Sequence, residues 1–200
     1  MADTSRDGER SEAEEAIMRA TYRALCEHGY ADLTMRAIAE EYGKTTAAIH
    51  YHYETKDDLL VALLEYLLDR FVAHVHDVET TGPEARLEAL LDTLISERTD
   101  DHDLLVAILE MRAQAPYDEA MRDQLVHNDE YLRYLLRTVV ADGVEQGVFA
   151  ADVDPSRAAE TLMTFVDGAR TRFVVSGDPD VLRHAREAAD RYVADALDAE

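Results

Sequence analysis

The sequence predicts an all-α protein, and three observations lead to this fold class. Helix-favouring residues dominate the 200-residue chain, which has only 4 prolines and 8 glycines, so long helices can run with few interruptions. Apolar residues recur at helical spacing in most segments. No segment alternates polar and apolar residues for long enough to indicate a strand. With 47% hydrophobic residues, the chain also has enough apolar material for a core.

The first predicted helix covers residues 11–28 and follows a polar segment, residues 1–10, which we expect to be disordered. Ser11 and Glu14 have the spacing of a capping box, in which each residue satisfies a main-chain N–H of the other. Gly29 suits the left-handed position that follows many helices. The first helix is therefore bounded by recognisable signals at both ends.

Two short helices are predicted next, over residues 35–42 and about 46–51. Thr34 is placed to cap the first of them, and Gly43 occupies the tight turn between the two. Two short helices around such a turn, with a helix on either side, form a helix-turn-helix layout. The second helix of this layout enters the major groove of DNA. We therefore predict a helix-turn-helix motif over residues 34–53.

The remaining elements are also predicted to be helical. A helix from about residue 56 to 78 begins with two acidic residues, which the helix dipole favours. Apolar spacing, prolines and glycines then predict helices over residues 84–98, 103–115, 117–146, 155–176 and 179–197. The resulting organisation is a DNA-binding domain over residues 11–56, a linking helix over 57–78 and a helical domain over 79–200.

The charge is distributed unevenly along the chain. Acids outnumber bases by 43 to 20, which gives a net charge of −23, and only Lys44 and Lys56 are lysines. Such a composition is typical of a salt-rich cytoplasm, because dense carboxylates keep a surface hydrated although they repel one another at low salt. Strong acidity argues against nucleic-acid binding. However, residues 57–200 carry −19 of the net charge. Residues 34–56 are neutral, with three acids and three bases, and both lysines are among those bases.

The second short helix has the pattern of a DNA-reading helix. Ile49 and Tyr53 are four residues apart and are expected to pack inward. Small side chains near its start allow close approach to the groove, and hydroxyl and imidazole groups can donate to phosphates or base edges. The residues left facing solvent or DNA are Thr45, Thr46, Ala47, Ala48, His50, Tyr51 and His52.

The motif resembles that of the TetR/AcrR family of transcription regulators. The matching residues, spread over about residues 11–70, are Ile17, Ala20, Leu25, Gly29, Tyr30, Thr34, Ile38, Ala39, Gly43, Thr45, Ile49, His52, Tyr53, Thr55, Lys56, Asp57, Asp58 and Leu59. The resemblance implies a TetR-like fold. It further implies that Thr34, Thr45, Tyr51 and Lys56 contact phosphates and that Arg36, Thr46, Ala47 and Ala48 lie at or near base edges.

Three positions depart from the family pattern. Lys44 stands where an aliphatic residue is usual, Tyr42 where a small residue is common, and His50 replaces a tyrosine that touches a phosphate. These departures leave the fold unaffected but leave the preferred bases open. Lys44 and His50 join the candidate DNA contacts, and the alternative for Lys44 and Lys56 is that both are ordinary surface cations.

The resemblance also assigns the C-terminal part to ligand sensing and dimerisation. It implies a homodimer through the helices at 155–176 and 179–197. Their apolar faces carry Leu162, Phe165, Val166, Ala169, Phe173, Ala185, Ala188, Ala189, Tyr192, Val193 and Ala196, with Gly168 allowing close backbone approach. The alternative is that these residues form an internal core.

A small-molecule effector pocket is expected in the same part of the chain. Such pockets have mostly apolar walls with a few polar anchors. The candidates are Tyr66, Met111, Arg112, Tyr131, Tyr134, Phe165 and Arg170, of which the arginines suit an anion. The alternative is that they are ordinary core residues and surface charges, and the effector itself is not specified.

Other function classes find no support in the sequence. One cysteine, Cys26, allows no internal disulfide and suits a reducing cytoplasm. We expect no metal site, cofactor, catalytic residues, secretory signal or membrane span. The prediction is a cytoplasmic transcription regulator that binds a pseudo-palindromic operator in double-stranded DNA, as a repressor released by a ligand. The alternative is an acidic helical dimer that binds a small molecule or partner protein without binding DNA.

Overall fold

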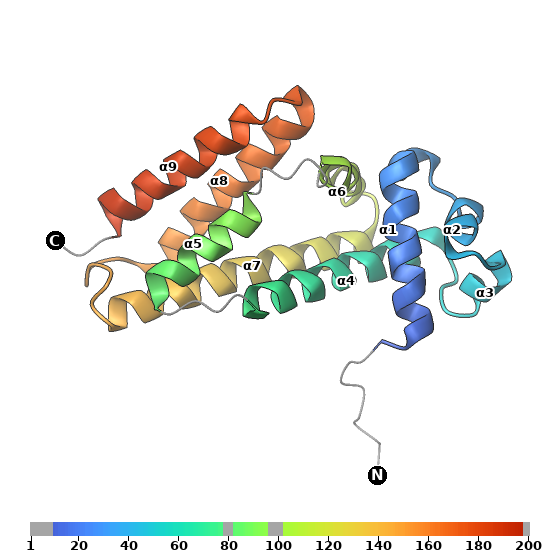
Figure 1. The fold of residues 1–200 in the computed structure, drawn as a ribbon, viewed down its shortest axis with the longest axis horizontal. Helices are drawn as coiled ribbons and strands as arrows, with labels where there is room; N and C mark the ends of the chain where they lie inside the picture. Colours follow the sequence, from blue (N-terminus) through green and yellow to red (C-terminus); the bar gives the residue numbers. More distant parts are fainter. Residues whose placement is uncertain (1–9, 78–81, 96–101, 198–200) are drawn as a thin grey trace, which may run out of the picture.

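Figure 1 shows the computed structural model, which describes residues 10–77, 82–95 and 102–197. Within these ranges the chain forms α-helices and no strand, which confirms the predicted all-α class. None of the helices in these ranges has the length and apolar character needed to span a membrane. The helices are α1 (Glu12–Asp32), α2 (Met35–Tyr42), α3 (Thr46–His50), α4 (Lys56–Asp77), α5 (Pro83–Leu94), α6 (His102–Gln114), α7 (Glu119–Glu145), α8 (Pro155–Ser176) and α9 (Asp180–Ala196).

Three predicted helix boundaries are wrong for local reasons. α1 does not end before Gly29: the chain kinks there, with φ 71° and ψ 171°, and continues helically to Asp32. α7 begins two residues later than predicted because the Asp118 carboxylate accepts the main-chain N–H of Met121, at 2.9 Å, and so caps the helix. α5 ends at Leu94 rather than near residue 98, since Ile95 leaves helical geometry with φ −116° and ψ 54°. Residues 78 and 96–98 themselves lie outside the described residues.

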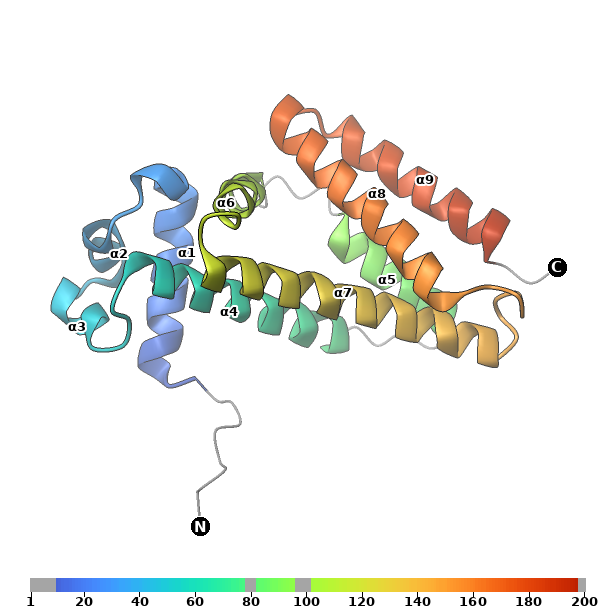
Figure 2. The same ribbon diagram turned by 180° about the vertical axis from the view of Figure 1, so that it is seen from behind.

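The helices form an elongated molecule with the helix-turn-helix at one end. α1, α2 and α3 pack together at this end, and α4 and α7 run side by side along the molecule (Figures 1 and 2). α8 and α9 pair with each other, and α5 contacts both α7 and α9. α6 lies between the two parts and contacts α1 on one side and α7 and α8 on the other.

Two clusters of buried residues hold this arrangement together. One lies around α1 to α4, and the other lies among α5, α7, α8 and α9. The first cluster also contains Ala107 and Met111 of α6 and Met121 and Leu125 of α7. The N-terminal core therefore extends beyond the predicted DNA-binding domain of residues 11–56, because distant helices supply part of its apolar surface.

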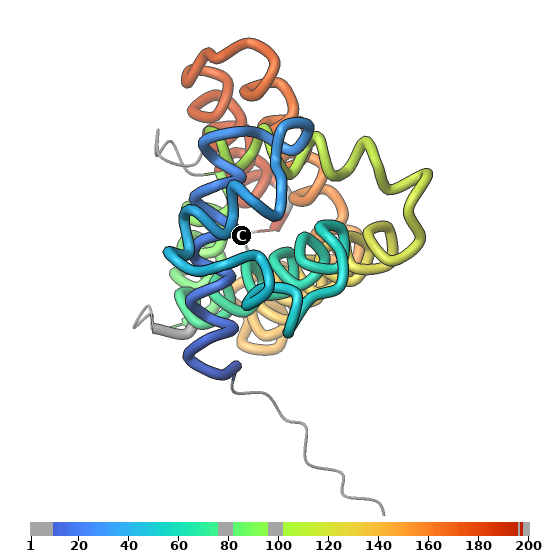
Figure 3. The backbone as a smooth tube through the Cα atoms, turned by 90° about the vertical axis from the view of Figure 1, so that its right-hand side faces the viewer, coloured from blue at the N-terminus to red at the C-terminus, as the bar shows by residue number. Residues whose placement is uncertain are grey.

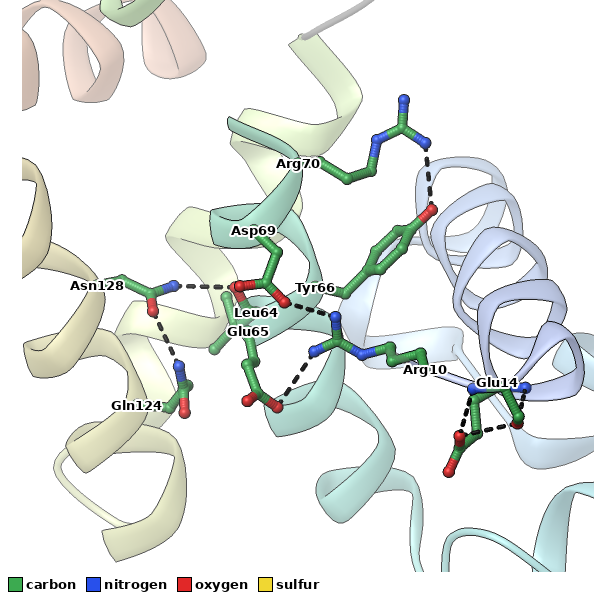
Figure 4. A network of polar contacts seen from close by, with 10 residues as sticks. Arg10, Glu14, Leu64, Glu65, Tyr66, Asp69, Arg70, Gln124 and Asn128 are labelled. Atoms are coloured by element: carbon green, nitrogen blue, oxygen red, sulfur yellow. Dashed lines mark hydrogen bonds and ion pairs between the residues drawn. The ribbon is translucent and has the colours of Figure 1, made fainter. Parts of the chain in front are cut away.

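Arg10, which we expected to lie in a disordered segment, is anchored on α4 (Figure 4). Its guanidinium forms ion pairs with Glu65, at 3.2 Å, and with Asp69. It also lies over the ring of Tyr66, 5.5 Å from the centroid. These partners lie more than fifty residues away in the sequence, so local composition gave no sign of them. Residues 1–9 lie outside the described part of the chain.

We expect Gly143→Ala to destabilise the fold by about 1–3 kcal/mol, the usual range for overpacking. A Cβ atom at Gly143 would lie 2.1 Å from Cδ2 and 2.4 Å from Cε2 of Phe149, a ring that is 1% exposed and has little room to move. Urea unfolding measures the change. Ala141→Ser, which adds one atom on the exposed side of the same helix, is the control, and equal stability of both variants would contradict this account.

Candidate nucleic-acid interface

The turn of the helix-turn-helix depends on a left-handed glycine. Gly43 has φ 70° and ψ 22°, a conformation that a side chain disfavours. The main-chain N–H groups of Gly43 and Lys44 donate to the carbonyl oxygens of Glu40 and Ala39, each at 3.2 Å, and close the end of α2. At the other end, the Thr34 hydroxyl accepts the N–H of Ala37 at 3.1 Å, which confirms the predicted cap.

The reading helix α3 lies at the outer end of the molecule, as Figure 3 shows from that side. Ile49 is completely buried and Tyr53 is partly buried, as predicted. The Tyr51 side chain is 86% exposed. Of the other candidates on this face, Thr45, Ala47 and His50 are exposed, whereas Thr46, Ala48 and His52 are partly buried.

Thr45 precedes α3 without capping it. It occupies the N-cap position, but its side chain makes no capping hydrogen bond. Its exposed hydroxyl is therefore not used by the first turn of the helix. This leaves the group in a position suited to donating to a phosphate oxygen.

Both lysines lie against tyrosine rings, a feature that the sequence analysis missed. The Lys44 ammonium is 4.7 Å from the centroid of the Tyr42 ring and 3.2 Å from its hydroxyl. The Lys56 ammonium is likewise 4.7 Å from the Tyr30 ring, and it donates to the Tyr30 carbonyl at 3.3 Å. Such cation–π contacts orient an ammonium without neutralising its charge.

Two of the three carboxylates of the same segment, those of Glu40 and Glu41, are paired with arginines instead. Arg36 binds Glu40 at 3.0 Å, and Arg23 of α1 binds Glu41 at 2.8 Å. Among the described residues, neither lysine forms an ion pair with a carboxylate. The surface around α3 therefore keeps two positive charges that are available to phosphates.

His52 faces α1 rather than open solvent. Its Nδ1 atom lies 3.7 Å from the carboxylate of Glu14, and its side chain is only 21% exposed. Glu14 forms the predicted capping box with Ser11. The Ser11 main-chain N–H, and then its hydroxyl, hold the pKa of the Glu14 carboxyl below its usual value, although slight burial opposes this and nearby His52 adds to it. His52 therefore connects the end of the reading segment to the start of α1.

A second candidate site is a small cavity between α6 and α8. It brings together two of the predicted ligand residues, Arg112 and Arg170, and the other lining residues are Leu105, Ile108, Leu109, Asp167, Thr171 and Val174. Arg112 pairs with Asp129 at 2.7 Å and with Asp167 at 3.5 Å. Burial raises the pKa of Asp129; the positive charge of Arg112 opposes the rise and Asp167 adds to it. The cavity therefore combines apolar walls with a coupled group of charges.

The other predicted ligand residues lie elsewhere. Tyr66 and Met111 are buried in the N-terminal core, and the Tyr66 hydroxyl accepts from Arg70 at 3.2 Å (Figure 4). Tyr131 and Tyr134 lie next to each other on α7, with Tyr134 49% exposed. Phe165 lies against Tyr192 of α9. The cavity therefore unites only the two arginines of the predicted set.

Comparison with known proteins finds family matches for both the N-terminal and the C-terminal part of the chain. Residues 17–63 match the family described as bacterial regulatory proteins of the tetR family. Residues 83–198 match the family described as BetI-type transcriptional repressor, C-terminal. The chain belongs to the TetR family. It is a DNA-binding transcription regulator and not an enzyme, which removes the alternative of an acidic dimer that does not bind DNA.

Individual relatives of this TetR-family regulator agree. A TetR transcription regulator from Haloarcula marismortui is 56% identical, with a TM-score of 0.88 over 94% of this chain and 100% of that one. The transcriptional repressor AcnR from Corynebacterium diphtheriae is 25% identical over 88% of this chain and 89% of its own. The fold also matches a putative regulator from Saccharomonospora viridis in complex with choline, at 23% identity and a TM-score of 0.79 over 96% and 100% of the two chains.

The last two helices of this TetR-family chain each have an inner and an outer face. Leu162, Val166, Ala169, Phe173 and Ala189 are buried in the chain's own core, so the alternative of an internal core is correct for them. The outer groove between α8 and α9 is lined by Thr164, Phe165, Gly168, Arg172, His184, Ala185 and Ala188, and also by Ala169 and Val181, which belong to the core as well. The side chain of Ala196 lies outside the described part of the chain.

We expect the capping box to make the stability of this regulator depend on acidic pH. The pKa of the Glu14 carboxyl is lower in the folded than in the unfolded chain. The ionised carboxylate therefore contributes fully to stability at pH values above its unfolded-state pKa, about 4.3. This contribution is lost as the pH falls through the folded-state pKa. The unfolding free energy of the wild type should therefore fall more steeply than that of Glu14→Gln between about pH 5 and pH 3.

Urea unfolding at several pH values measures this difference. Glu12→Gln is the control, because it removes a carboxylate from the same turn but lies outside the capping box. Parallel pH profiles for the wild type and Glu14→Gln would show that the ionised carboxylate of Glu14 contributes nothing to stability.

Proposed function

We propose that this TetR-family chain works as a cytoplasmic homodimer that represses transcription from a pseudo-palindromic operator and is released by a small molecule. The observation that carries the DNA-binding site is the charge arrangement around α3. Arginines pair with Glu40 and Glu41 of α2, while Lys44 and Lys56 lie over tyrosine rings in a chain of net charge −23. This arrangement supports phosphate contacts from both lysines.

The operator and Lys56 are tested together. A two-fold dimer requires half-sites about 10 bp apart, or a multiple of that spacing, and footprinting on genomic fragments identifies them. Lys56→Ala should then weaken binding similarly on all sequences and lower the salt slope by about one unit per lost contact. The control is Arg137→Ala, which removes a cation over the Tyr134 ring on α7. If both variants had the same affinity and the same salt slope, Lys56 would be an ordinary surface cation without a phosphate contact.

We propose that the outer groove of α8 and α9 forms the dimer interface. An added Cβ at Gly168 meets nothing within 4 Å in the single chain, and exposed Val175 lies on the same helix. Gly168→Arg should therefore leave the fold of each chain intact but convert dimers to monomers in sedimentation experiments. Ser156→Arg, at the exposed start of α8, is the matched control. Dimers of unchanged stability for Gly168→Arg would place the interface elsewhere.

We propose that the effector enters between α6 and α8, with Arg112 and Arg170 as anchors for an anionic group. The cavity has a volume of about 40 Å³, which suits a few water molecules rather than a metabolite. An effector must therefore move α6 away from α8, and because α6 also contacts α1, the reading helices would shift. The lining residues given by the structure include no aromatic ring, whereas quaternary ammonium groups bind in aromatic cages, so choline fits this cavity poorly.

We further propose that the protein is adapted to high salt. Raising KCl shortens the Debye length from about 10 Å at 0.1 M to about 3 Å at 1 M, which screens repulsion within the acidic fold and between protein and DNA. Helical content should therefore rise toward molar KCl. As the KCl concentration rises, operator affinity should fall less steeply than that of a basic regulator governed by counter-ion release alone.

Circular dichroism and operator titrations from about 0.1 to 3 M KCl measure both effects. A non-ionic osmolyte at matched osmolality is the control, because it favours compact states without screening charge. A fully folded protein at low salt, with affinity that drops steeply throughout, would contradict the proposal.

A further inference from the structure

Tyr30 lies where the DNA-binding end meets the rest of the molecule. It directly follows the kink at Gly29 in α1. Its main-chain N–H donates to the carboxylate of Glu110 on α6 at 2.8 Å. On its other side, its carbonyl and its ring both hold the ammonium of Lys56, at 3.3 Å and 4.7 Å. A single residue of α1 is therefore fixed by α6 and in turn fixes the first residue of α4.

The kink explains why Glu110 is needed at this position. The backbone of Gly29 leaves helical geometry, with ψ 171°, so the N–H of Tyr30 turns away from the path of the helix. A main-chain N–H that is partly buried requires an acceptor. The carboxylate of Glu110 supplies it, and it lies so close that a Cβ atom at Gly29 would be 3.6 Å from the same oxygen.

We propose that Glu110 is a positioning residue for the DNA contact of Lys56 and acts through Tyr30. An ammonium has three donors. One is directed to the Tyr30 carbonyl, which leaves two for phosphate oxygens, and the ring beneath restricts where the ammonium can lie. Losing the Glu110 contact frees the Tyr30 backbone and so removes the fixed position of Lys56. The inference rests on the phosphate contact of Lys56 proposed above.

An electrostatic effect of Glu110 alone and the proposed positioning role predict opposite changes in DNA affinity when Glu110 is replaced. Glu110 carries a negative charge close to the DNA-binding end, so its removal should weaken repulsion from DNA and raise affinity. A positioning role makes the same substitution lower affinity. The direction of the change therefore separates the two roles without any assumption about its size.

The experiment uses the full chain and its operator, with affinity measured by fluorescence anisotropy at several KCl concentrations. We expect Glu110→Ala to weaken binding about threefold to tenfold, as for loss of one hydrogen bond, and to lower the salt slope toward that of Lys56→Ala. Glu110→Gln keeps an oxygen acceptor and should remain close to the wild type. Asp103→Ala, which removes an exposed acid from the same helix, is the control for charge.

Glu110→Asp covers the case in which Glu110→Ala does not fold. This substitution keeps the charge but shortens the side chain by one methylene. Operator affinity should stay unchanged if only the charge of Glu110 matters, and it should fall if Glu110 positions Tyr30. In the double variant with Lys56→Ala, either substitution at Glu110 should add little further loss, because the two residues act through one contact.

Three results would overturn the inference. The first is unchanged or tighter operator binding by both Glu110→Ala and Glu110→Asp. The second is a loss of affinity from the Glu110 substitutions that adds fully to the loss from Lys56→Ala. The third is normal operator binding by Lys56→Ala itself. In each case the wild type still binds the operator. If the wild type protected no palindromic site, the proposed operator would fail instead, so the two failures are distinguishable.

Discussion

Helix α4 belongs to both cores of the molecule, and the remaining packing depends on this constraint. Its first half buries Leu59, Leu60 and Leu63 among the helices of the DNA-binding end. Its second half packs Phe71 and Val75 against the C-terminal core. Asn128 of α7 donates to a carbonyl in the middle of α4 at 3.0 Å. The helix-turn-helix therefore cannot change its angle to the C-terminal helices without disturbing buried surface on α4.

α6 provides the second connection between the two ends, and it is less deeply anchored. Met111 faces the N-terminal core, Glu110 binds the main chain of α1, and Arg112 pairs with acids on α7 and α8. Three consecutive residues thus contact the DNA-binding end on one side and α7 and α8 on the other. A short helix with this arrangement is well suited to transmit a change at the cavity, because a displacement of α6 alters contacts on both sides at once.

The acidic composition and DNA binding are compatible because charge is organised locally. Most of the excess carboxylates lie beyond residue 56, and the two acids of α2, Glu40 and Glu41, are paired with arginines. The two lysines are held by aromatic rings rather than by acids. The net charge therefore describes the surface as a whole, whereas binding depends on the few groups within a Debye length of the phosphates.

The sequence by itself determined the helices, the motif and the family. Caps at Ser11 and Thr34 and the glycine at position 43 are local signals, because each acts on main-chain groups within a few residues. Helical periodicity likewise identified Ile49 as a residue that packs inward. These features follow from short-range hydrogen bonding and from apolar spacing, which the order of residues encodes directly.

Only the tertiary structure decided which residues from distant helices meet. It anchors Arg10 on α4, places Tyr30 between Glu110 and Lys56, and unites just two residues of the predicted ligand set in one cavity. It also separates the inner face of α8 from the outer groove that the sequence pattern merged with it. Periodicity shows that a helix has an apolar face but not which neighbour covers it, because that depends on packing between segments far apart in the chain.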